Sequence, residues 1–217
     1  MPLPYQTLDF PAAPADRPYV FINMVTTIDG KILTGERDEP VMDLGSASDH
    51  AVMRRIEAAA DAVMVGAGVI RATPRLWYEK RLKRIVVTSS GTVPWDNRFF
   101  TDAPEQAFVA TNAPIDLPHG VGRLPVDIPE LLRVLRLEYG VQHLLVEGGS
   151  ELNASLLQED VVDELFLTLA PKIKLGRDIP TYADGDPLPR ADIRQYELVE
   201  CHQVEDELFM RYRRKTA

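Results

Sequence analysis

Cysteine is nearly absent from this chain, since one residue, Cys201, occurs among 217. No intrachain disulfide and no zinc site built on cysteines can therefore form, and a lone cysteine fits a reducing compartment. Long hydrophobic runs are also missing, because no stretch approaches the roughly 20 apolar residues that a membrane helix needs. The first residues lack the charged region and apolar core of a secretory signal. We therefore expect a cytoplasmic protein that does not bind a membrane.

Positive charge is scarce as well. The 24 lysine and arginine residues are outnumbered by 33 aspartate and glutamate residues, which gives a net charge of −9. Binding to a nucleic-acid backbone needs a basic face, so this balance argues against a nucleic-acid partner, although it permits a local basic pocket for one phosphorylated ligand. The four histidines show no metal-ligand spacing, and no Gly-x-Ser-x-Gly elbow is present. We expect neither a metal site nor hydrolytic chemistry.

Apolar strands alternate with amphipathic helices along most of the chain. Residues 1–18 contain five prolines and are predicted to form an extended arm, and residues 19–217 are predicted to form a single domain. Asp29-Gly30 is expected to turn the chain tightly, with residues 31–33 continuing the sheet. The alternation predicts an α/β fold with a mostly parallel central sheet, antiparallel C-terminal strands and helices on both faces. We expect strands at 19–27, 62–66, 84–88, 107–111, 143–147 and 164–169, helices at 48–60, 127–139 and 150–158, and two strands around 205–207.

Two of the predicted strands end in glycines. Val63–Gly66 is followed by Ala67-Gly68, and Leu145–Glu147 is followed by Gly148-Gly149-Ser150. Glycine lets a ligand approach the backbone, and the free amides at the start of a following helix attract phosphate. Ligands of open α/β sheets bind outside the carboxyl ends of the strands. We therefore expect a ligand site at these two strand ends, with close packing of helix on strand as the alternative for each glycine pair.

The segment after the next strand bears on which nicotinamide cofactor would bind. The usual dinucleotide fingerprint needs a third glycine and an acidic residue about 20 positions later, and this chain has neither. The strand 84–88 instead leads into Ser89 and Ser90. Serines with Arg84 nearby suit the 2′-phosphate of NADPH better than the bare ribose hydroxyl of NADH. NADPH is therefore the predicted cofactor, and ordinary turn residues are the alternative.

Three further positions each allow two interpretations. Glu147 follows an apolar run, so its carboxylate needs partners, and these are either a polar ligand or local backbone amides. Asp29 precedes Gly30 in a common turn pair, which favours a structural role. The dipeptide Trp77-Tyr78 either stacks on a ligand or anchors its own loop by its aromatic rings.

Several short motifs occur in a fixed order along the chain. They are Phe21–Lys31, Val65–Gly68, Arg84–Ser89, Val146–Gly149, Val162–Leu165 and Ala170–Ile173, followed by Gly176 and Pro180-Thr181. In this order they resemble the riboflavin-biosynthesis reductase family, which comprises the reductase domain of the bacterial bifunctional deaminase-reductase and its stand-alone archaeal and fungal relatives. The resemblance runs from about Tyr19 to the C-terminus.

The resemblance implies a dihydrofolate-reductase-like fold, a homodimer, and NADPH-dependent reduction of a phosphorylated ribosylamino-pyrimidine to its ribitylamino form. It assigns no catalytic residue. The deaminase half of the bifunctional enzymes needs a His-x-Glu and a Pro-Cys-x-x-Cys, so the lone cysteine implies that any deaminase is a separate protein. The implied site residues are Asn23, Asp29 and Glu147 toward the substrate, and Val25, Thr26, Gly66, Gly68, Ser89, Gly148, Gly149, Ser150 and Leu152 toward the cofactor.

The sequence departs from the family pattern directly after Gly68. The family has a threonine and then Asp-Asp-Pro in this stretch, whereas the chain reads Val69-Ile-Arg-Ala-Thr-Pro74, without either acid. Two alternatives therefore stay open: a related NADPH reductase of another pterin or pyrimidine, including a dihydrofolate-reductase-like activity, and a non-catalytic nucleotide-binding homologue. For the proton that the reduction requires, the candidates are Glu147, Asp29 and ordered water.

Overall fold

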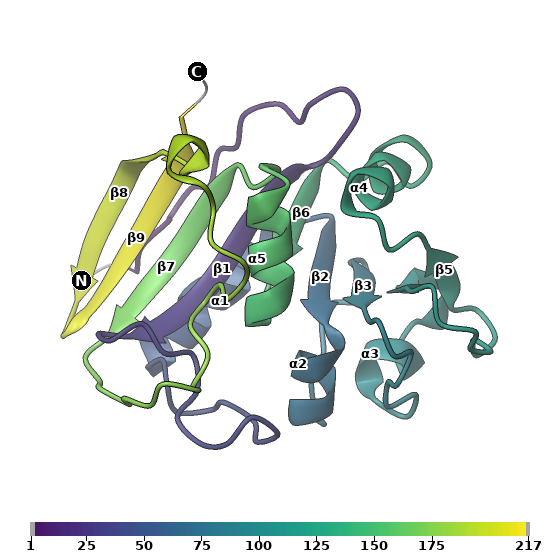
Figure 1. The fold of residues 1–217 in the computed structure, drawn as a ribbon, viewed down its shortest axis with the longest axis horizontal. Helices are drawn as coiled ribbons and strands as arrows, with labels where there is room; N and C mark the ends of the chain where they lie inside the picture. Colours follow the sequence, from purple (N-terminus) through teal and green to yellow (C-terminus); the bar gives the residue numbers. More distant parts are fainter. Residues whose placement is uncertain (1–2, 216–217) are drawn as a thin grey trace.

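The computed structural model describes residues 3–215, which form a mixed sheet flanked by helices (Figure 1). The described strands follow the order β5-β4-β3-β2-β6-β1-β7-β9-β8. Neighbours from β5 to β7 run parallel, whereas β9 pairs antiparallel with both β7 and β8. The elements are β1 (Tyr19–Thr27), α1 (Ala47–Ala58), β2 (Ala62–Gly66), α2 (Ala67–Ala72), β3 (Lys83–Val87), α3 (Arg98–Thr101), η1 (Pro104–Gln106), β4 (Ala107–Ala110), β5 (Gly122–Leu124), α4 (Ile128–Leu137), β6 (His143–Val146), α5 (Ser150–Gln158), β7 (Glu164–Ala170), η2 (Arg190–Asp192), β8 (Tyr196–Val204) and β9 (Glu207–Arg214).

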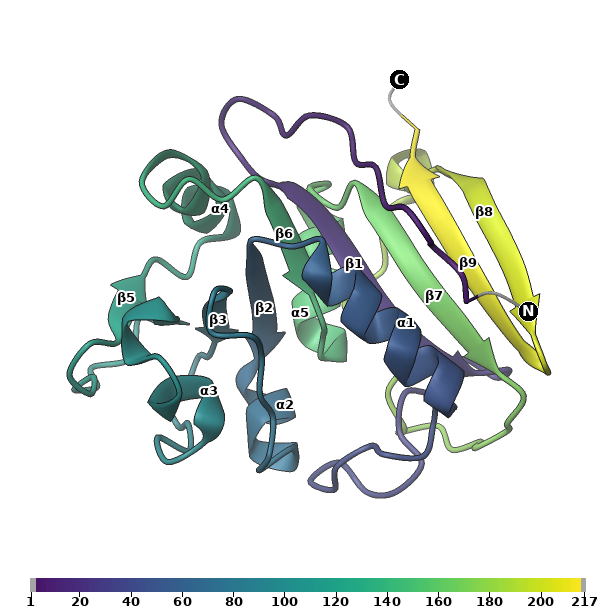
Figure 2. The same cartoon turned by 180° about the vertical axis from the view of Figure 1, so that it is seen from behind.

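The central strands are buried on both faces because helices cover both sides of the sheet. Successive residues of β1 enter opposite cores, with Val20 in one and Phe21 in the other, as the period of two in a strand requires. Helix α1 packs Ile56 into the core that contains Phe21, and Figure 2 shows this helix lying across that face. Helices α4 and α5 bring Leu135 and Leu156 to the opposite core. The predicted fold class, including helices on both faces and antiparallel C-terminal strands, is confirmed.

Local sequence signals explain where the longer helices begin. The hydroxyl of Ser46 accepts hydrogen bonds from the backbone amides of Ser48 and Asp49 at 3.1 and 3.3 Å, so α1 begins next to a side-chain cap. Asp127 accepts from the amide of Glu130 at 3.1 Å and caps α4, within the predicted helix at 127–139. Helix α5 occupies the predicted range without change. Within residues 3–215, no helix is long and apolar enough to cross a membrane.

The structure corrects the prediction that residues 31–33 continue the sheet. Gly30 turns the chain with φ +80°, and after this turn only Lys31 forms a bridge, to Thr181. The amide of Ile32 donates to the carbonyl of Pro180 at 3.1 Å, so the segment pairs with a loop instead of a strand. The elements α2, α3 and β5 were not predicted. They are short, with six, four and three residues, which leaves too few positions for a periodic pattern to show.

Residues 3–18, the described part of the predicted arm, form no helix or strand and pack along the sheet on the face that α1 covers (Figure 2). The ring of Phe10 stacks on Phe21 with centroids 4.6 Å apart, and Tyr5 is 4% exposed. Arg17 forms an ion pair with Asp163 at 2.6 Å. These contacts attach the arm to the domain. Residues 1 and 2 of the predicted arm and residues 216 and 217 of the predicted domain lie outside the described residues.

A buried ion cluster joins β7 to β9 and β1. Glu164 is fully buried, and its carboxylate accepts from Arg211 Nε at 2.6 Å, Arg213 Nε at 2.8 Å and the Tyr19 hydroxyl at 2.9 Å. Glu164→Gln should lower the free energy of unfolding by about 3–5 kcal/mol, because the buried Arg211 would lose its main counter-charge. Urea denaturation measures this. The exposed pair of Glu79 with Arg81 supplies a control, since Glu79→Gln should cost less than about 1 kcal/mol; equal effects would contradict the account.

Candidate active site

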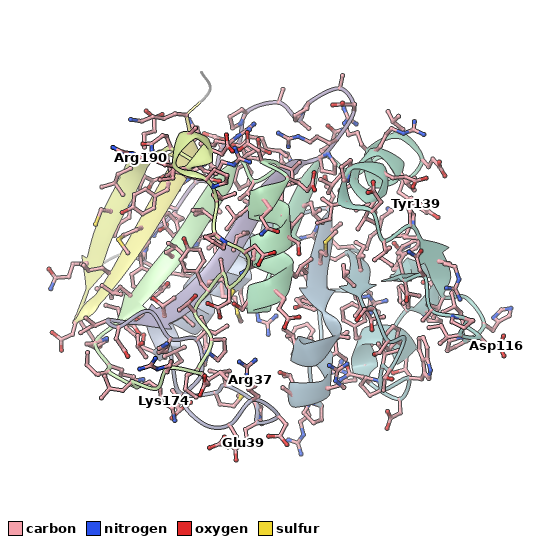
Figure 3. All side chains as sticks on the ribbon, viewed as in Figure 1. Arg37, Glu39, Asp116, Tyr139, Lys174 and Arg190 are labelled. Atoms are coloured by element: carbon pink, nitrogen blue, oxygen red, sulfur yellow. The ribbon has the colours of Figure 1, made fainter. Side chains whose placement is uncertain are left out.

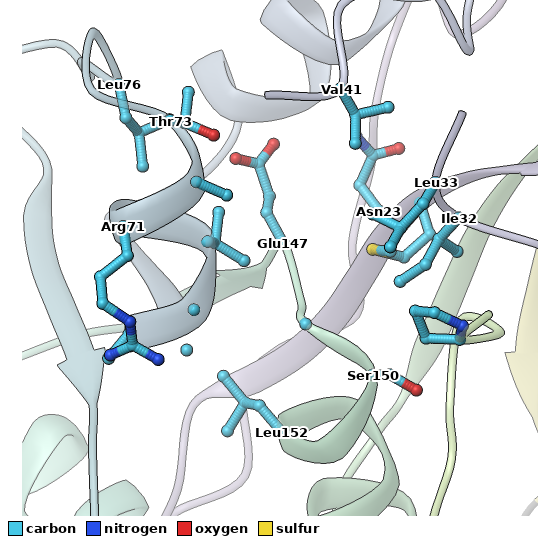
Figure 4. A pocket seen from close by; sticks show the side chains of 18 of the residues that line it. Asn23, Ile32, Leu33, Val41, Arg71, Thr73, Leu76, Glu147, Ser150 and Leu152 are labelled. Atoms are coloured by element: carbon cyan, nitrogen blue, oxygen red, sulfur yellow. The ribbon is translucent and has the colours of Figure 1, made fainter. Parts of the chain in front are cut away.

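A cavity of about 1230 Å³ opens at the carboxyl-terminal ends of the central strands, where the two glycine-bearing strand ends meet (Figure 4). Its volume exceeds the roughly 300–1,000 Å³ of an ordinary small-ligand pocket, so it has room for a cofactor and a substrate together. Strands β3, β2, β6 and β1 are neighbours in the sheet, and residues at or near their carboxyl-terminal ends line the cavity. Of the residues predicted from the sequence, it is lined by Asn23, Val25, Gly66, Gly68, Ser89, Glu147, Gly149, Ser150 and Leu152.

Three of the four glycines at the two strand ends line the cavity, and they differ in how much room lies beside them. The amide of Gly66 donates to the carbonyl of Gly148 at 2.7 Å, and a Cβ on Gly66 would lie 3.4 Å from the amide nitrogen of Gly149. A Cβ on Gly68 would meet nothing closer than the Arg71 guanidinium at 3.9 Å, and one on Gly149 nothing closer than Val69 at 4.0 Å. Gly68 and Gly149 therefore present bare main chain to the cavity. This surface fits a dinucleotide that approaches the backbone closely.

Arg84 does not reach this site, contrary to the prediction that it accompanies Ser89. Its side chain is fully buried, and its Nη2 donates to the carbonyl of Ala103. Arg71 lines the cavity instead, together with Ser89 and Ser90, and its Nη1 donates to the carbonyl of Thr92 at 2.9 Å. Figure 4 shows Arg71 extending from α2 along one wall of the cavity. The cationic group beside the serines is thus supplied by α2 and not by β3.

Glu147 places a carboxyl group inside the cavity. Its Oε2 accepts a hydrogen bond of 2.7 Å from the hydroxyl of Tyr78, whereas its Oε1 is buried and has no hydrogen-bond partner among the described residues. Figure 4 shows the carboxyl group standing between Asn23 and the segment that bears Thr73 and Leu76. An unpartnered buried carboxylate oxygen is costly. Oε1 of Glu147 therefore needs either a hydrogen-bond donor from a bound ligand or a proton of its own.

The surroundings of Glu147 favour its protonated form. Burial raises the pKa of Glu147 from 4.5 to about 7, and the negative charge of Glu57 adds to the rise. The hydrogen bond from Tyr78, the positive charge of Arg54 and the nearby polar side chain of Asn23 oppose it. A carboxyl group with this pKa exchanges its proton near neutral pH, which is the property that general acid–base catalysis needs.

Asp29 lies outside the cavity lining, where it ties two loops together. Its carboxylate accepts from the Thr27 hydroxyl at 2.6 Å and from the amides of Lys174 and Leu175 at 3.1 and 2.8 Å. These hydrogen bonds, that of Thr27 first, lower the pKa of Asp29 to about 2. Its environment is that of a permanently ionised structural carboxylate.

The loop between β1 and α1 forms the outer wall of the cavity (Figure 3). Arg37 and Glu39 both line the cavity from this loop. Arg37 donates to the carbonyl of Asp178 at 2.9 Å, and Lys174 Nζ donates to the carbonyl of Thr34 at 2.7 Å. The loop is therefore held by the segment that follows β7.

Two predicted cofactor residues, Thr26 and Gly148, do not line the cavity, although both adjoin residues that do. Both residues of the dipeptide at 77–78 line the cavity. Tyr78 is 2% exposed and anchors the loop, while Trp77 is 39% exposed and has the guanidinium carbon of Arg54 4.6 Å from its ring centroid. Sequence reasoning missed Arg71, for which the only signal was a basic residue three positions after Gly68. In the part of the chain that the structure describes, no three His, Cys, Asp or Glu side chains gather as a metal site requires.

Comparisons with known proteins identify the family of this chain. The model of the RibD C-terminal domain family matches residues 18–209. A 2,5-diamino-6-ribosylamino-4(3H)-pyrimidinone 5′-phosphate reductase of Archaeoglobus fulgidus is 34% identical over 209 residues, covering 84% of this chain and 94% of that protein.

Solved structures extend the comparison to the fold. RibD of Acinetobacter baumannii superposes with a TM-score of 0.77 at 20% identity, covering 92% of this chain and 58% of that one. Dihydrofolate reductase of Enterococcus faecalis, solved in complex with NADP(H), has a TM-score of 0.56 at 12% identity, with 91% and 96% covered. The predicted dihydrofolate-reductase-like fold is thereby confirmed. The chain belongs to the RibD C-terminal domain family, the reductase family of riboflavin biosynthesis.

Proposed function

We propose that this protein is an NADPH-dependent reductase that converts a phosphorylated ribosylamino-pyrimidine to its ribitylamino form in riboflavin biosynthesis. One observation carries the proposal: a relative named for the reduction of such a pyrimidinone phosphate aligns over nearly its whole length at 34% identity. The cavity supports it, because it combines bare main chain at Gly68 and Gly149 with a buried carboxyl group at Glu147.

The cofactor is proposed to lie along the strand ends of β2, β3 and β6. Gly66, Gly68 and Gly149 would allow its approach to the main chain, and Ser150 would meet it at the start of α5, where the free amides favour a phosphate. The bound nicotinamide supplies the hydride for the reduction. The chain's own residues position the substrate beside it and exclude water from the reacting carbon.

Arg71 is proposed to select NADPH over NADH. Its guanidinium lines the cavity beside Ser89 and Ser90, so that it would meet a 2′-phosphate with two neighbouring hydroxyls. Arg71→Ala should raise the KM for NADPH about tenfold or more, the value of one charge-assisted hydrogen bond, and leave the KM for NADH unchanged. Initial rates with both cofactors give the answer, and NADH is the internal control. Equal losses for the two cofactors would remove Arg71 from this role.

Glu147 is proposed to contact the substrate and to provide the proton that the reduction consumes. Its pKa of about 7 lets it hold a proton at neutral pH and release it within the site. Asp29, the other carboxylate considered, is held ionised by three hydrogen bonds and lies outside the cavity lining. We therefore propose no catalytic role for Asp29. Asn23, which lines the cavity next to Glu147, remains a proposed substrate contact.

The protein is further proposed to act as a homodimer in the cytoplasm, with deamination left to a separate protein. The comparison supports the last point. The aligned region covers 94% of the Archaeoglobus reductase, whereas it covers 51% of the RibD protein of Actinobacillus pleuropneumoniae. The lone cysteine accords with a reducing compartment.

NADPH oxidation with a panel of substrates tests the proposed function. The panel contains the diamino and the deaminated ribosylamino-pyrimidine phosphates and dihydrofolate. Turnover of a ribosylamino-pyrimidine phosphate supports the proposal. Turnover of dihydrofolate alone would favour a related reductase, an outcome to which the missing acids after Gly68 lend weight, and binding of NADPH without turnover of any substrate would indicate a non-catalytic homologue.

A further inference from the structure

Tyr78 contacts the carboxyl group of Glu147 from a distant part of the chain. It lies in the loop after α2, 69 residues before Glu147, and its ring packs edge-on against Phe99 with centroids 6.1 Å apart. Its hydroxyl donates to Oε2 of Glu147 at 2.7 Å. Burial and the neighbouring charge of Glu147 hold the pKa of Tyr78 well above 10. The hydroxyl therefore keeps its proton and remains a donor at every pH at which the enzyme would work.

This hydrogen bond makes the two oxygens of Glu147 unequal. Oε2 accepts from Tyr78, while Oε1 is buried and has no partner among the described residues. A neutral carboxyl group accepts best at its carbonyl oxygen and carries its proton on the other oxygen. The proton of Glu147 is therefore placed on Oε1.

An ion pair on α1, formed by Arg54 and Glu57, acts on the charge of Glu147. Glu57 is 4% exposed, and Arg54 Nη1 donates to both of its oxygens at 2.9 and 2.7 Å. The groups that act on the charge of Glu147 are thus Tyr78 from its loop, Glu57 and Arg54 from α1, and Asn23 from β1. Tyr78 and Glu57 act on it in opposite directions, which makes them a matched pair for an experiment.

We infer that Tyr78 is a positioning residue for the reduction: its hydroxyl fixes Oε2 of Glu147, so that Oε1 is the oxygen that holds the proton and delivers it to the substrate. This inference rests on the proposed function. In the step, hydride from the reduced nicotinamide forms a C–H bond at the ribose carbon bonded to nitrogen, and the bond from that carbon to the ring oxygen breaks. The ring oxygen leaves as a hydroxyl with the Oε1 proton, and the carboxylate regains a proton from water.

Tyr78→Phe and Glu57→Gln test the inference together. Tyr78→Phe keeps the buried ring and removes only the hydroxyl, so the titration midpoint of Glu147 should rise by about one pH unit, the usual value of a hydrogen bond to a charged group. Glu57→Gln removes a like charge and should lower that midpoint. Infrared difference spectra of the carboxyl band follow the titration without any substrate, and Glu147→Gln identifies the band. A thermal melt checks that each variant is folded.

Kinetics then distinguish positioning from packing. In Tyr78→Phe, kcat should fall about tenfold with the KM for NADPH within about twofold, and the alkaline limb of the pH profile should move with the Glu147 midpoint. The limb of Glu57→Gln should move the other way. An unchanged midpoint, or a moved midpoint with an unchanged kcat, would overturn the role of Tyr78. The proposed function is tested separately: a wild-type protein that turns over no pyrimidine phosphate would overturn it. The titration of Glu147 contains no substrate, so its result does not depend on that outcome.

Discussion

Glu147→Gln should abolish most of the turnover and at the same time stabilise the folded protein at alkaline pH. The loss of kcat should be about a hundredfold or more, which is the usual contribution of a positioned general acid. NADPH affinity should change little, because the carboxyl group is proposed to face the substrate. Activity assays and NADPH titration give the two values.

The gain in stability follows from the raised pKa of Glu147. Below about pH 4.5 the side chain is protonated in both the folded and the unfolded protein, so it costs nothing. Between about pH 4.5 and the folded-state pKa of about 7, the unfolded chain gives up a proton that the folded protein keeps, so the stability falls over this range and stays lowered above it. At about 1.4 kcal/mol per pH unit, the difference between 4.5 and about 7 sets an upper limit of about 3–4 kcal/mol on this loss of stability. Glutamine avoids this cost, so the variant should be the more stable protein at pH 8 and lose its advantage toward pH 4.

Asp29→Asn is the matched control, because it replaces the other carboxylate considered for the proton. The folded-state pKa of Asp29 is lowered, so its contribution to stability is present above pH 4 and is lost as the pH falls toward about 2. Asp29→Asn should therefore weaken the fold at pH 8 and leave kcat within about threefold. A large loss of kcat in Asp29→Asn, or full activity in Glu147→Gln, would contradict the assignment of the two residues.

Gly68→Val should prevent NADPH binding without weakening the fold. The added Cβ would meet only the end of the flexible Arg71 side chain, at 3.9 Å, so the new side chain extends into the cavity. Within α2, valine also has a better helix propensity than glycine. The Kd for NADPH should rise about a hundredfold or more, the cost of filling a close-contact surface, while the melting temperature stays within a few degrees. Calorimetric titration and a thermal melt measure the two effects.

Gly140→Ala gives the opposite control. Gly140 has φ +68° at the end of α4, where a side chain is strained although it meets no atom within 4 Å. Alanine there should cost about 1 kcal/mol of stability and leave NADPH affinity unchanged. Normal NADPH binding by Gly68→Val would show that the cofactor does not lie along α2.

The features that the sequence predicted well are those set by neighbouring residues. An apolar strand followed by glycine is a local pattern, and so the strand ends at Gly66 and Gly149 could be predicted from the sequence. The same holds for Glu147, because a carboxylate directly after the buried run Leu144–Val146 must be either partnered or functional.

The features that could not be predicted depend on segments far apart in the chain. Arg84 is five positions before Ser89 in the sequence, but five residues of extended chain span about 16 Å, so a residue at the start of β3 cannot serve a site at its end. Arg71 reaches that site because α2 packs beside the segment at Thr92. The contact between Tyr78 and Glu147 joins two loops 69 residues apart, and no periodicity connects them.

Transfer of labelled hydride tests the central claim most directly. The protein is supplied with NADPH that carries deuterium at the transferred position and with the ribosylamino-pyrimidine phosphate, and the product is analysed by mass spectrometry and NMR. The account predicts a ribitylamino product with one deuterium on the carbon bonded to nitrogen. Recovery of unreduced substrate from a folded protein, or a reduced product without deuterium, would contradict it.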